Sequence, residues 1–182
     1  MIIFRTDAST EIGIGHAMRC LRLANILTDQ YGEKCEFICH DHIGNNIEYI
    51  EQQGFKVTKI NKKNKSKVFK KNEYEDLTYY KWLGNNWQED LEQTKLALQG
   101  KVIDWLIIDH YAIDKKWETK IRPYVKEIMV IDDLADRFHD CDLLLDQNLV
   151  ENFETRYQNL LPKHCRTLLG PQFALLGQEY SK

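Results

Sequence analysis

Short apolar runs alternate along this chain with stretches in which apolar residues recur every three to four positions, and this alternation limits the possible folds more than any other feature. The run at 102–108 is typical of a strand that is buried on both faces. Such strands belong to parallel sheets, whose crossover helices cover both faces. The apolar runs lie at 2–6, 34–39, 55–60, 102–108, 127–131 and 142–145, and the helical stretches at 16–31, 43–53, 86–99 and 114–122. The pattern therefore predicts an α/β fold with a doubly wound, mostly parallel sheet.

Charge and hydropathy exclude several classes of partner. The 182 residues suffice for one sizeable domain, and the net charge of -3 lacks the basic excess of a nucleic-acid binder. The Lys-rich stretch at 62–71 lies among polar residues and is expected to be a solvated loop. No apolar run approaches the roughly 18 residues of a membrane helix, and charges at Arg5 and Asp7 interrupt any signal sequence. We expect a cytoplasmic protein with neither a nucleic-acid nor a membrane partner, whose five cysteines are free thiols.

The loop after the first run carries the most informative chemistry. Run 2–7 is followed by Gly13 and Gly15, with His16 opening the predicted helix. A glycine-rich turn at a helix start lets a ligand approach the backbone and favours anions. The third glycine of a dinucleotide fingerprint is replaced by Met18, and no Gly-Lys-Ser/Thr of a Walker loop follows. The helix start disfavours an imidazolium, so His16 is a candidate general base beside a phosphate-bearing substrate; a mere helix cap stays the alternative.

Polar clusters also follow the later apolar runs. They are Asp109-His110-Tyr111, the pair Asp132-Asp133, and Asp146 with Gln147 and Asn148. A single cluster of this kind is often ordinary turn chemistry. In a parallel sheet, however, the carboxyl ends of all strands lie at one edge, so these groups should line one crevice together with His16. Asp132 and Asp133 are adjacent on an extended chain and point to opposite faces, so one should face the crevice while the other caps a turn or orients a donor.

Metal binding and extensive aromatic stacking are not favoured by the pattern. Cys35 and Cys39 stand about 13 Å apart on an extended strand, too far to share a zinc ion with His40 or His42. We therefore expect no metal. Among the aromatic residues only Tyr111, at a strand end, is given a ligand role. The remainder of the aromatic group is expected to fill the core: Tyr79, Tyr80, Trp82 and Trp87.

Several motifs, taken together and in order, resemble one enzyme family. They lie at 4–9, 12–21, 23–24, 108–111, 131–137, 142–148 and 169–176. In these segments the chain resembles the UDP-2,4-diacetamido-2,4,6-trideoxy-β-L-altropyranose hydrolases of pseudaminic acid biosynthesis, often labelled spore coat polysaccharide biosynthesis proteins. The resemblance implies the N-terminal half of a two-domain GT-B architecture. Residues 1–165 would form a Rossmann-like domain, and 166–182 the start of a linker toward a missing C-terminal nucleotide-binding domain supplied in cis or in trans.

The same resemblance implies an activity. The UDP–sugar bond would be hydrolysed with inversion at the sugar C1, releasing UDP and free sugar without metal or other cofactor. His16 matches the catalytic base of the family, and Tyr111 would contact the sugar or position water. Arg5, Asp7 and Arg19 are assigned to support or binding. The other substrate-binding candidates are Gly13, Gly15, Asp109, His110, Asp132, Asp133 and Asn148.

Two departures from the family pattern leave alternatives open. Gly177 stands where the family usually has arginine, and the chain ends where the nucleotide-binding domain would begin. We therefore expect little turnover from this chain alone, while a homo-oligomer is left open. The alternatives are a non-catalytic half-enzyme that binds a partner domain, and a GT-B nucleotide-sugar glycosyltransferase or epimerase.

Overall fold

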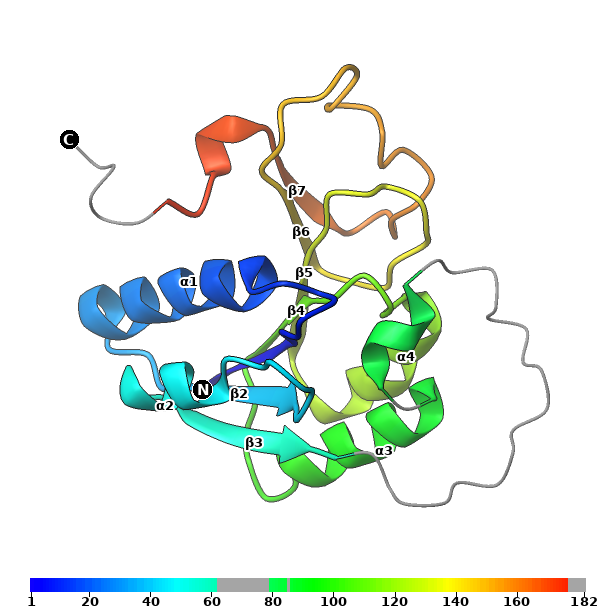
Figure 1. The fold of residues 1–182 in the computed structure, drawn as a ribbon. Coiled ribbons are helices and arrows are strands. Elements are labelled where there is room, and N and C mark those ends of the chain that lie inside the picture. The colour runs from blue at the N-terminus through cyan, green and yellow to red at the C-terminus, as the bar shows by residue number, and fades with distance from the viewer. Residues whose placement is uncertain (62–78, 85, 177–182) are drawn as a thin grey trace.

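The computed structural model describes residues 1–61, 79–84 and 86–176 of the chain. Across those residues a seven-stranded, all-parallel sheet forms the centre of the molecule, in the order β3-β2-β1-β4-β5-β6-β7 (Figure 1). The strands are β1 (Ile2–Thr6), β2 (Cys35–His40), β3 (Lys56–Ile60), β4 (Trp105–Asp109), β5 (Glu127–Ile131), β6 (Leu143–Asp146) and β7 (Arg166–Leu169). The predicted α/β, Rossmann-like arrangement is confirmed, and the sheet is wholly rather than mostly parallel.

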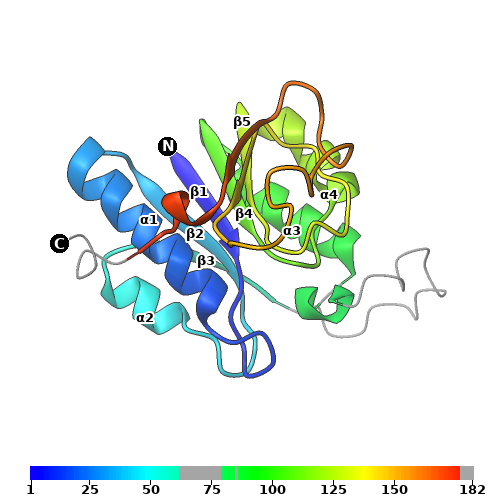
Figure 2. The same ribbon diagram turned by 90° about the horizontal axis from the view of Figure 1, so that it is seen from above.

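Helices cover both faces of this sheet. Helices α1 and α2 lie on one face, and α3 and α4 on the other (Figures 1 and 2). The bounds are α1 (Gly15–Tyr31), α2 (Ile47–Gln52), α3 (Trp87–Leu98) and α4 (Lys115–Ile121), with short 3-10 turns η1 (Tyr80–Leu83), η2 (Arg122–Tyr124) and η3 (Pro171–Phe173). Every predicted apolar run forms a strand and every predicted helical stretch forms a helix, with ends displaced by a few residues. The Lys-rich stretch at 62–71 lies outside the described residues.

Each strand supplies apolar side chains to both layers in turn, which explains why the runs lack a polar face. Ile2 and Phe4 of β1 pack with α1 and α2, whereas Ile3 packs in the cluster that holds α3 and α4. In β4, Ile107 faces the first layer, while Leu106 and Ile108 face the second. Full burial of such a side chain stabilises the fold by about 1.5–3 kcal/mol. Two helical layers on one sheet therefore require strands that are apolar throughout.

The sheet extends beyond the domain boundary expected at residue 165. Arg166–Leu169 pairs in parallel with β6, Leu143 lying opposite Arg166, so the expected linker start is a strand of the sheet. After β7 the chain turns at Gly170, whose φ of 101° suits glycine, into η3. The division of a longer protein into two domains stays a prediction.

An apolar cleft of about 430 Å³ lies on the α1 face of the sheet. Leu23 and Leu27 of α1 form one wall, and Phe173 and Leu175 lie on the segment that leaves the sheet. Its floor comes from the central and outer strands: Ile107, Met129, Leu143, Leu145 and Leu168. Among the described helices, none has the length and apolar character of a membrane span. The five cysteines are free thiols as expected, and the Cys141 and Cys165 sulfurs are 3.5 Å apart, well beyond bonding distance.

Candidate active site

The carboxyl end of β4 meets the first turn of α1 through three ionisable side chains. Asp109, the last residue of β4, lies with Oδ1 2.6 Å from His16 Nδ1. Arg19 binds both oxygens of the same carboxylate, with Nε 2.5 Å from Oδ2 and Nη2 2.7 Å from Oδ1. His16 and Arg19 are separated by three residues on α1, so they lie on the same side of the helix. The sequence-based expectation that His16 meets the later strand ends is thus realised through Asp109.

The hydrogen-bond pattern fixes which nitrogen of His16 is free. Burial alone would raise the pKa of Asp109, but the hydrogen bond from Arg19 and the neighbouring His16 hold it below its ordinary value. The ionised carboxylate can only accept, so the proton between the two groups belongs to His16 Nδ1. Arg19 Nη2 lies 3.2 Å from the same nitrogen, but it donates to Asp109 Oδ1 at 2.7 Å, so its contact with a protonated Nδ1 is not a hydrogen bond. In the neutral imidazole Nε2 therefore carries the lone pair, the form that a general base needs.

His16 does not serve as a helix cap. The N-cap residue of α1 is Ile14, which makes no side-chain hydrogen bond, while the imidazole reaches across to Asp109. His16 is 8% exposed, so it lies at the border of the interior rather than sealed within it. Asp109 and Arg19 contact the imidazole directly. The sequence argument considered only the helix start and left these two side chains out.

Tyr111 and Asp133 extend the cluster toward β5. The Tyr111 hydroxyl donates to Asp133 Oδ1, and Arg19 Nη1 lies 3.1 Å from Asp133 Oδ2. The Tyr111 ring stands at 90° to the His16 ring, with centroids 4.4 Å apart. Burial, together with the hydrogen bond to Asp133, raises the pKa of Tyr111. Tyr111 therefore remains a phenol that contacts and orients, and it is not a candidate base.

Two aromatic residues that the sequence assigned to the core also border this site. Trp82 stacks on Tyr111 at 5.6 Å between centroids and meets His16 edge-on at 6.2 Å. Tyr79 packs against both Trp82 and Tyr111, at 4.6 and 5.1 Å. Both residues also contact the core, so for them the expectation was correct for packing and incomplete for the site. For Tyr80 the expectation was wrong, because its side chain is exposed. The signal that was available is the dense aromatic group 79–87.

Arg5 and Asp7 belong to a buried cluster of charged side chains at the carboxyl end of β1. The Arg5 guanidinium binds Asp7 at 2.6 and 3.0 Å and Asp90 of α3 at 2.5 Å. Arg5 and Asp90 are 0% exposed and Asp7 is 1% exposed. Asp7 also accepts the backbone N–H of His40 at 2.6 Å, and Asp90 accepts the indole N–H of Trp117 at 2.9 Å. Of the two roles expected for Arg5 and Asp7, this burial favours support over ligand contact.

His110 belongs to the same buried cluster of charged side chains. Its Nδ1 accepts the backbone N–H of Ala112 at 3.1 Å, so its proton sits on Nε2, 3.1 Å from Asp7 Oδ2. Burial lowers the pKa of His110, while Asp7 acts in the opposite direction. His110 thus stays neutral and links β4 to β1, although the sequence placed it among the ligand-binding candidates.

Asp132 and Asp133 take different positions, as their alternation predicts. Asp132 is buried, accepts the backbone N–H of Ala135 in the following turn at 3.0 Å, and pairs with Arg137 at 2.8 Å. Asp133 is half-buried and faces Tyr111. Asn148 lies after β6, where its backbone N–H donates to Asp146 at 3.0 Å, and among the described contacts none joins its side chain to His16.

The glycines of the β1–α1 loop differ in what they require. Gly13 has φ +77°, a left-handed conformation that glycine adopts without strain, and its N–H donates to Ser9 O at 2.8 Å. Gly15 is the first residue of α1 and is exposed. In the described parts of the chain no group of three or more His, Cys, Asp or Glu side chains is placed to share a metal ion. Cys35 and Cys39 lie along extended β2, as the distance argument assumed.

The buried imidazole of His40 makes the stability of the fold depend on pH. His40 is 3% exposed, and both its ring nitrogens are without a hydrogen-bond partner in the described structure. Burial, with the nearby His42, lowers the pKa of His40 to about 4. The unfolded chain takes up the proton near pH 6.5, so the stability contribution is present above that pH and is lost as pH falls toward 4. The loss reaches on the order of 3 kcal/mol.

We expect His40→Leu to remove this dependence, because an apolar side chain leaves no nitrogen to protonate. Urea denaturation at pH 7 and pH 4.5 should show a smaller loss of unfolding free energy in the variant than in the wild-type chain. His164→Leu, at a largely exposed histidine, is the matched control. An identical loss in wild type and His40→Leu would assign the pH dependence to other groups.

Comparison with known proteins places this geometry in context. No family model matches the chain. The chain is 25% identical over 181 residues to a curated protein of Campylobacter jejuni named UDP-2,4-diacetamido-2,4,6-trideoxy-beta-L-altropyranose hydrolase. The match covers 98% of this chain and 53% of the relative, so the chain spans about half the length of the curated protein it matches. The resemblance inferred from the motifs is confirmed, and it is a distant similarity to a protein named as a nucleotide-sugar hydrolase.

Proposed function

We propose that this chain supplies the catalytic-base domain of a UDP-sugar hydrolase that cleaves a UDP-linked diacetamido-trideoxy sugar, in biosynthesis of pseudaminic acid and surface polysaccharides. The observation that carries the proposal is the 2.6 Å contact of Asp109 with His16, at the edge where the strands β1, β4 and β5 end. The name of the Campylobacter relative supports the substrate class. The geometry by itself supports a base that activates water in an aromatic-walled site.

The chemical step uses the free Nε2 of His16. Nε2 takes a proton from water as the water oxygen bonds to the sugar C1. The bond from C1 to the phosphate oxygen breaks, its electron pair leaves with UDP, and the configuration at C1 inverts. The His16 Nδ1–H remains hydrogen-bonded to Asp109, which stabilises the imidazolium formed in the step. The proton on Nε2 is then returned to solvent, which restores the base.

The surrounding groups orient the reactants. Tyr111 and Trp82 present ring faces and edges beside His16, a surface suited to the apolar face of a sugar ring. Arg19 holds Asp109 and Asp133 and so keeps the carboxylate that orients His16 in place. The UDP group would be bound mainly by a second, C-terminal domain, in keeping with the 53% of the relative that the chain spans.

The proposal is tested by UDP release from the UDP-linked diacetamido-trideoxy-altrose. We expect slow release with this chain alone, and restored release when the C-terminal half of a complete hydrolase is added or joined to it. Hydrolysis in ¹⁸O-water should place the label in the sugar and not in UDP, because attack is at C1. Label in UDP would refute C1 attack, and no UDP release in any combination would favour the non-catalytic, partner-binding alternative. Transfer of the sugar to an acceptor in place of water would identify a glycosyltransferase.

Asp109→Asn tests the orientation of the base. The asparagine amide can donate to Nδ1 and so favour the tautomer whose Nε2 carries a proton and cannot act as a base. We expect kcat for UDP release to fall about 10²- to 10⁴-fold with little change in KM. Asp136→Asn, at an exposed carboxylate, is the control. The ¹⁵N signals of His16 report the tautomer directly, and an unchanged tautomer with unchanged kcat would contradict the role given to Asp109.

A further inference from the structure

A second pocket, of about 280 Å³, adjoins the site on the side of β2. It is enclosed by the loop after β1, the loop after β2 and the turn η1. Trp82 lines it and also borders His16, so the pocket and the catalytic base share one wall. Its volume lies just below the range for small-molecule pockets, about 300–1,000 Å³. It therefore suits one substituted part of a sugar and not a whole nucleotide sugar.

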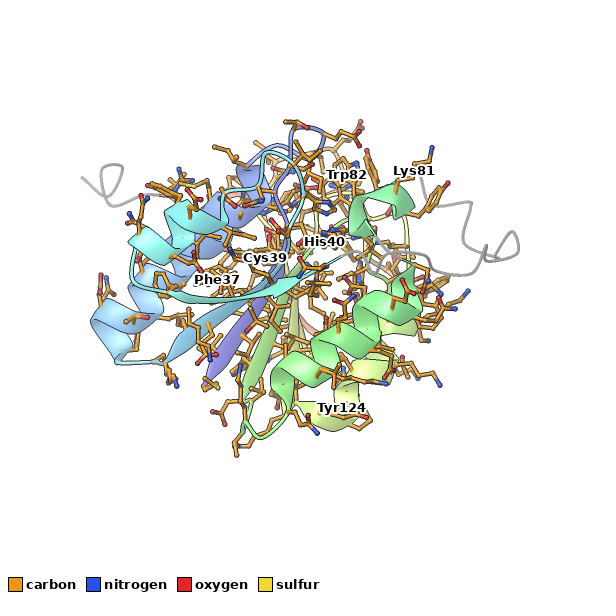
Figure 3. The ribbon with its side chains drawn as sticks, turned by 60° about the horizontal axis from the view of Figure 1, so that its bottom comes forward. Phe37, Cys39, His40, Lys81, Trp82 and Tyr124 are labelled. Atoms are coloured by element: carbon orange, nitrogen blue, oxygen red, sulfur yellow. The ribbon has the colours of Figure 1, made fainter. Side chains whose placement is uncertain are left out.

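The three segments pack so closely at two glycines, Gly44 and Gly84, that a side chain at either position would not fit. A Cβ on Gly84, which has φ +69°, would lie 2.7 Å from His42 Cε1 and 2.8 Å from His40 Nε2. The turn η1 thus rests directly on the two imidazoles, which stack on each other at 4.1 Å between centroids. A Cβ on Gly44 would lie 2.6 Å from Thr10 Cγ2, which fixes the loop after β2 against the loop after β1. Figure 3 shows Lys81 and Trp82 on η1 and His40 at the end of β2.

The lining of the pocket offers complementary groups. Ile12, Ile43 and the indole of Trp82 are apolar. His42 and Lys81 are polar, as are Ser9, Thr10 and Glu11 of the loop after β1. Buried Nε2 of His42 lies 3.8 Å from Asp7 Oδ2. Burial would raise the pKa of Asp7, but Arg5 and His110 hold it well below its ordinary value, so Asp7 is a carboxylate. Of the two neutral tautomers of His42, the nearby negative charge favours the one with its hydrogen on Nε2.

That tautomer leaves His42 Nδ1 as an acceptor, and Lys81, whose ammonium group can only donate, lines the same small, partly apolar pocket. A ligand group that satisfies all three properties has an N–H, a carbonyl oxygen and a methyl group. An acetamido group has this combination. A hydroxyl lacks the methyl, and a phosphate lacks both the methyl and the N–H donor while meeting the exposed carboxylate of Glu11, which also lines the pocket.

We propose that this pocket is the subsite for an acetamido substituent of the sugar. His42 accepts the amide N–H, Lys81 donates to the carbonyl oxygen, and Trp82 packs on the methyl group. The assignment rests on the proposed function, because the relative's named substrate carries two acetamido groups. It makes His42, Lys81 and Trp82 the residues that select N-acetylated sugars, next to the base that cleaves them.

The test uses the 182-residue chain itself, ¹⁵N-labelled and titrated with N-acetylglucosamine and, separately, with glucose. We expect the indole N–H signal of Trp82, assigned from Trp82→Phe, to shift saturably with the N-acetylated sugar, in the millimolar range up to about 50 mM. The response should be weaker by about fivefold or more when glucose replaces the N-acetylated sugar. The same loss is expected for the N-acetylated sugar with His42→Ala or Lys81→Ala, the effect of one lost hydrogen bond. Ile43→Trp, which fills the pocket from a position that is 88% exposed, should block it without disturbing the core. His164→Ala and Lys115→Ala are the controls.

The outcomes separate this assignment from the proposed function. Equal responses to both sugars, no shift at Trp82, or unchanged binding in His42→Ala, Lys81→Ala and Ile43→Trp would overturn the subsite. If UDP release depends on His16 while those variants leave KM unchanged, the subsite falls and the hydrolase stands. If acetamido binding at Trp82 is present but UDP release is absent from every combination tested, the subsite stands and the hydrolase falls.

Discussion

Replacing His16 with alanine is expected to lower UDP release about 10²- to 10⁴-fold in the assembled hydrolase, the contribution of a positioned general base. The imidazole is the group whose free nitrogen takes the proton of water in the proposed step. Since Asp109 and Arg19 stay paired without it, the fold should be retained. The loss should therefore appear in kcat, with KM nearly unchanged.

The control for this variant is His164→Ala, at a largely exposed histidine that pairs with Asp142 away from the described site contacts. This control variant should leave both kcat and KM unchanged. UDP release by His16→Ala at the wild-type rate would reject His16 as the base, whatever its effect on stability.

Replacing Arg5 with methionine is expected to cost about 3–5 kcal/mol of unfolding free energy. The guanidinium is fully buried and is shared by two carboxylates, Asp7 and Asp90. Its removal leaves both acids buried without that cation, a larger penalty than the net worth of an intact pair. A domain has only about 5–15 kcal/mol of stability, so the variant should be marginally folded. Urea denaturation at pH 7 measures the change.

Arg122→Met is the matched control for Arg5→Met. Arg122 also binds two carboxylates, Asp140 and Asp142, but its side chain is 29% exposed, so its loss should cost no more than about 1 kcal/mol. Adding Asp90→Asn to Arg5→Met should recover part of the lost stability, which keeps the test readable if the single variant is unfolded. Similar costs for Arg5→Met and Arg122→Met would show that burial does not set the strength of the network.

The fold was predictable because strand and helix signals were local and strong. β4 is apolar throughout, since both of its faces are covered, and α1 carries a broad apolar side. β7 was missed because Arg166–Leu169 is short, half exposed and at the edge of the sheet, so its sequence shows no buried run. The parallel order of the sheet then accounts for the meeting of His16 with the ends of β4 and β5, which the sequence did predict.

The buried cluster of charged side chains and the aromatic wall were less accessible to sequence reasoning. Strand alternation places Arg5 and Asp7 on one face but cannot reveal that Asp90 meets them from α3. The helical spacing did indicate that Asp90 is buried, because Asp90 shares a helix face with Thr94 and Leu98, which are both buried. Trp82 reaches the site from a segment without periodic pattern, so only the tertiary structure brings it beside His16.

The one-turn spacing of His16 and Arg19 on α1 has an evolutionary consequence. Both side chains converge on a single carboxylate, and an α-helix turns by about 100° per residue, so an insertion or deletion between them would swing one away from Asp109. Homologues that keep this pairing of His16 and Arg19 with one carboxylate should therefore have no insertion or deletion between positions 16 and 19.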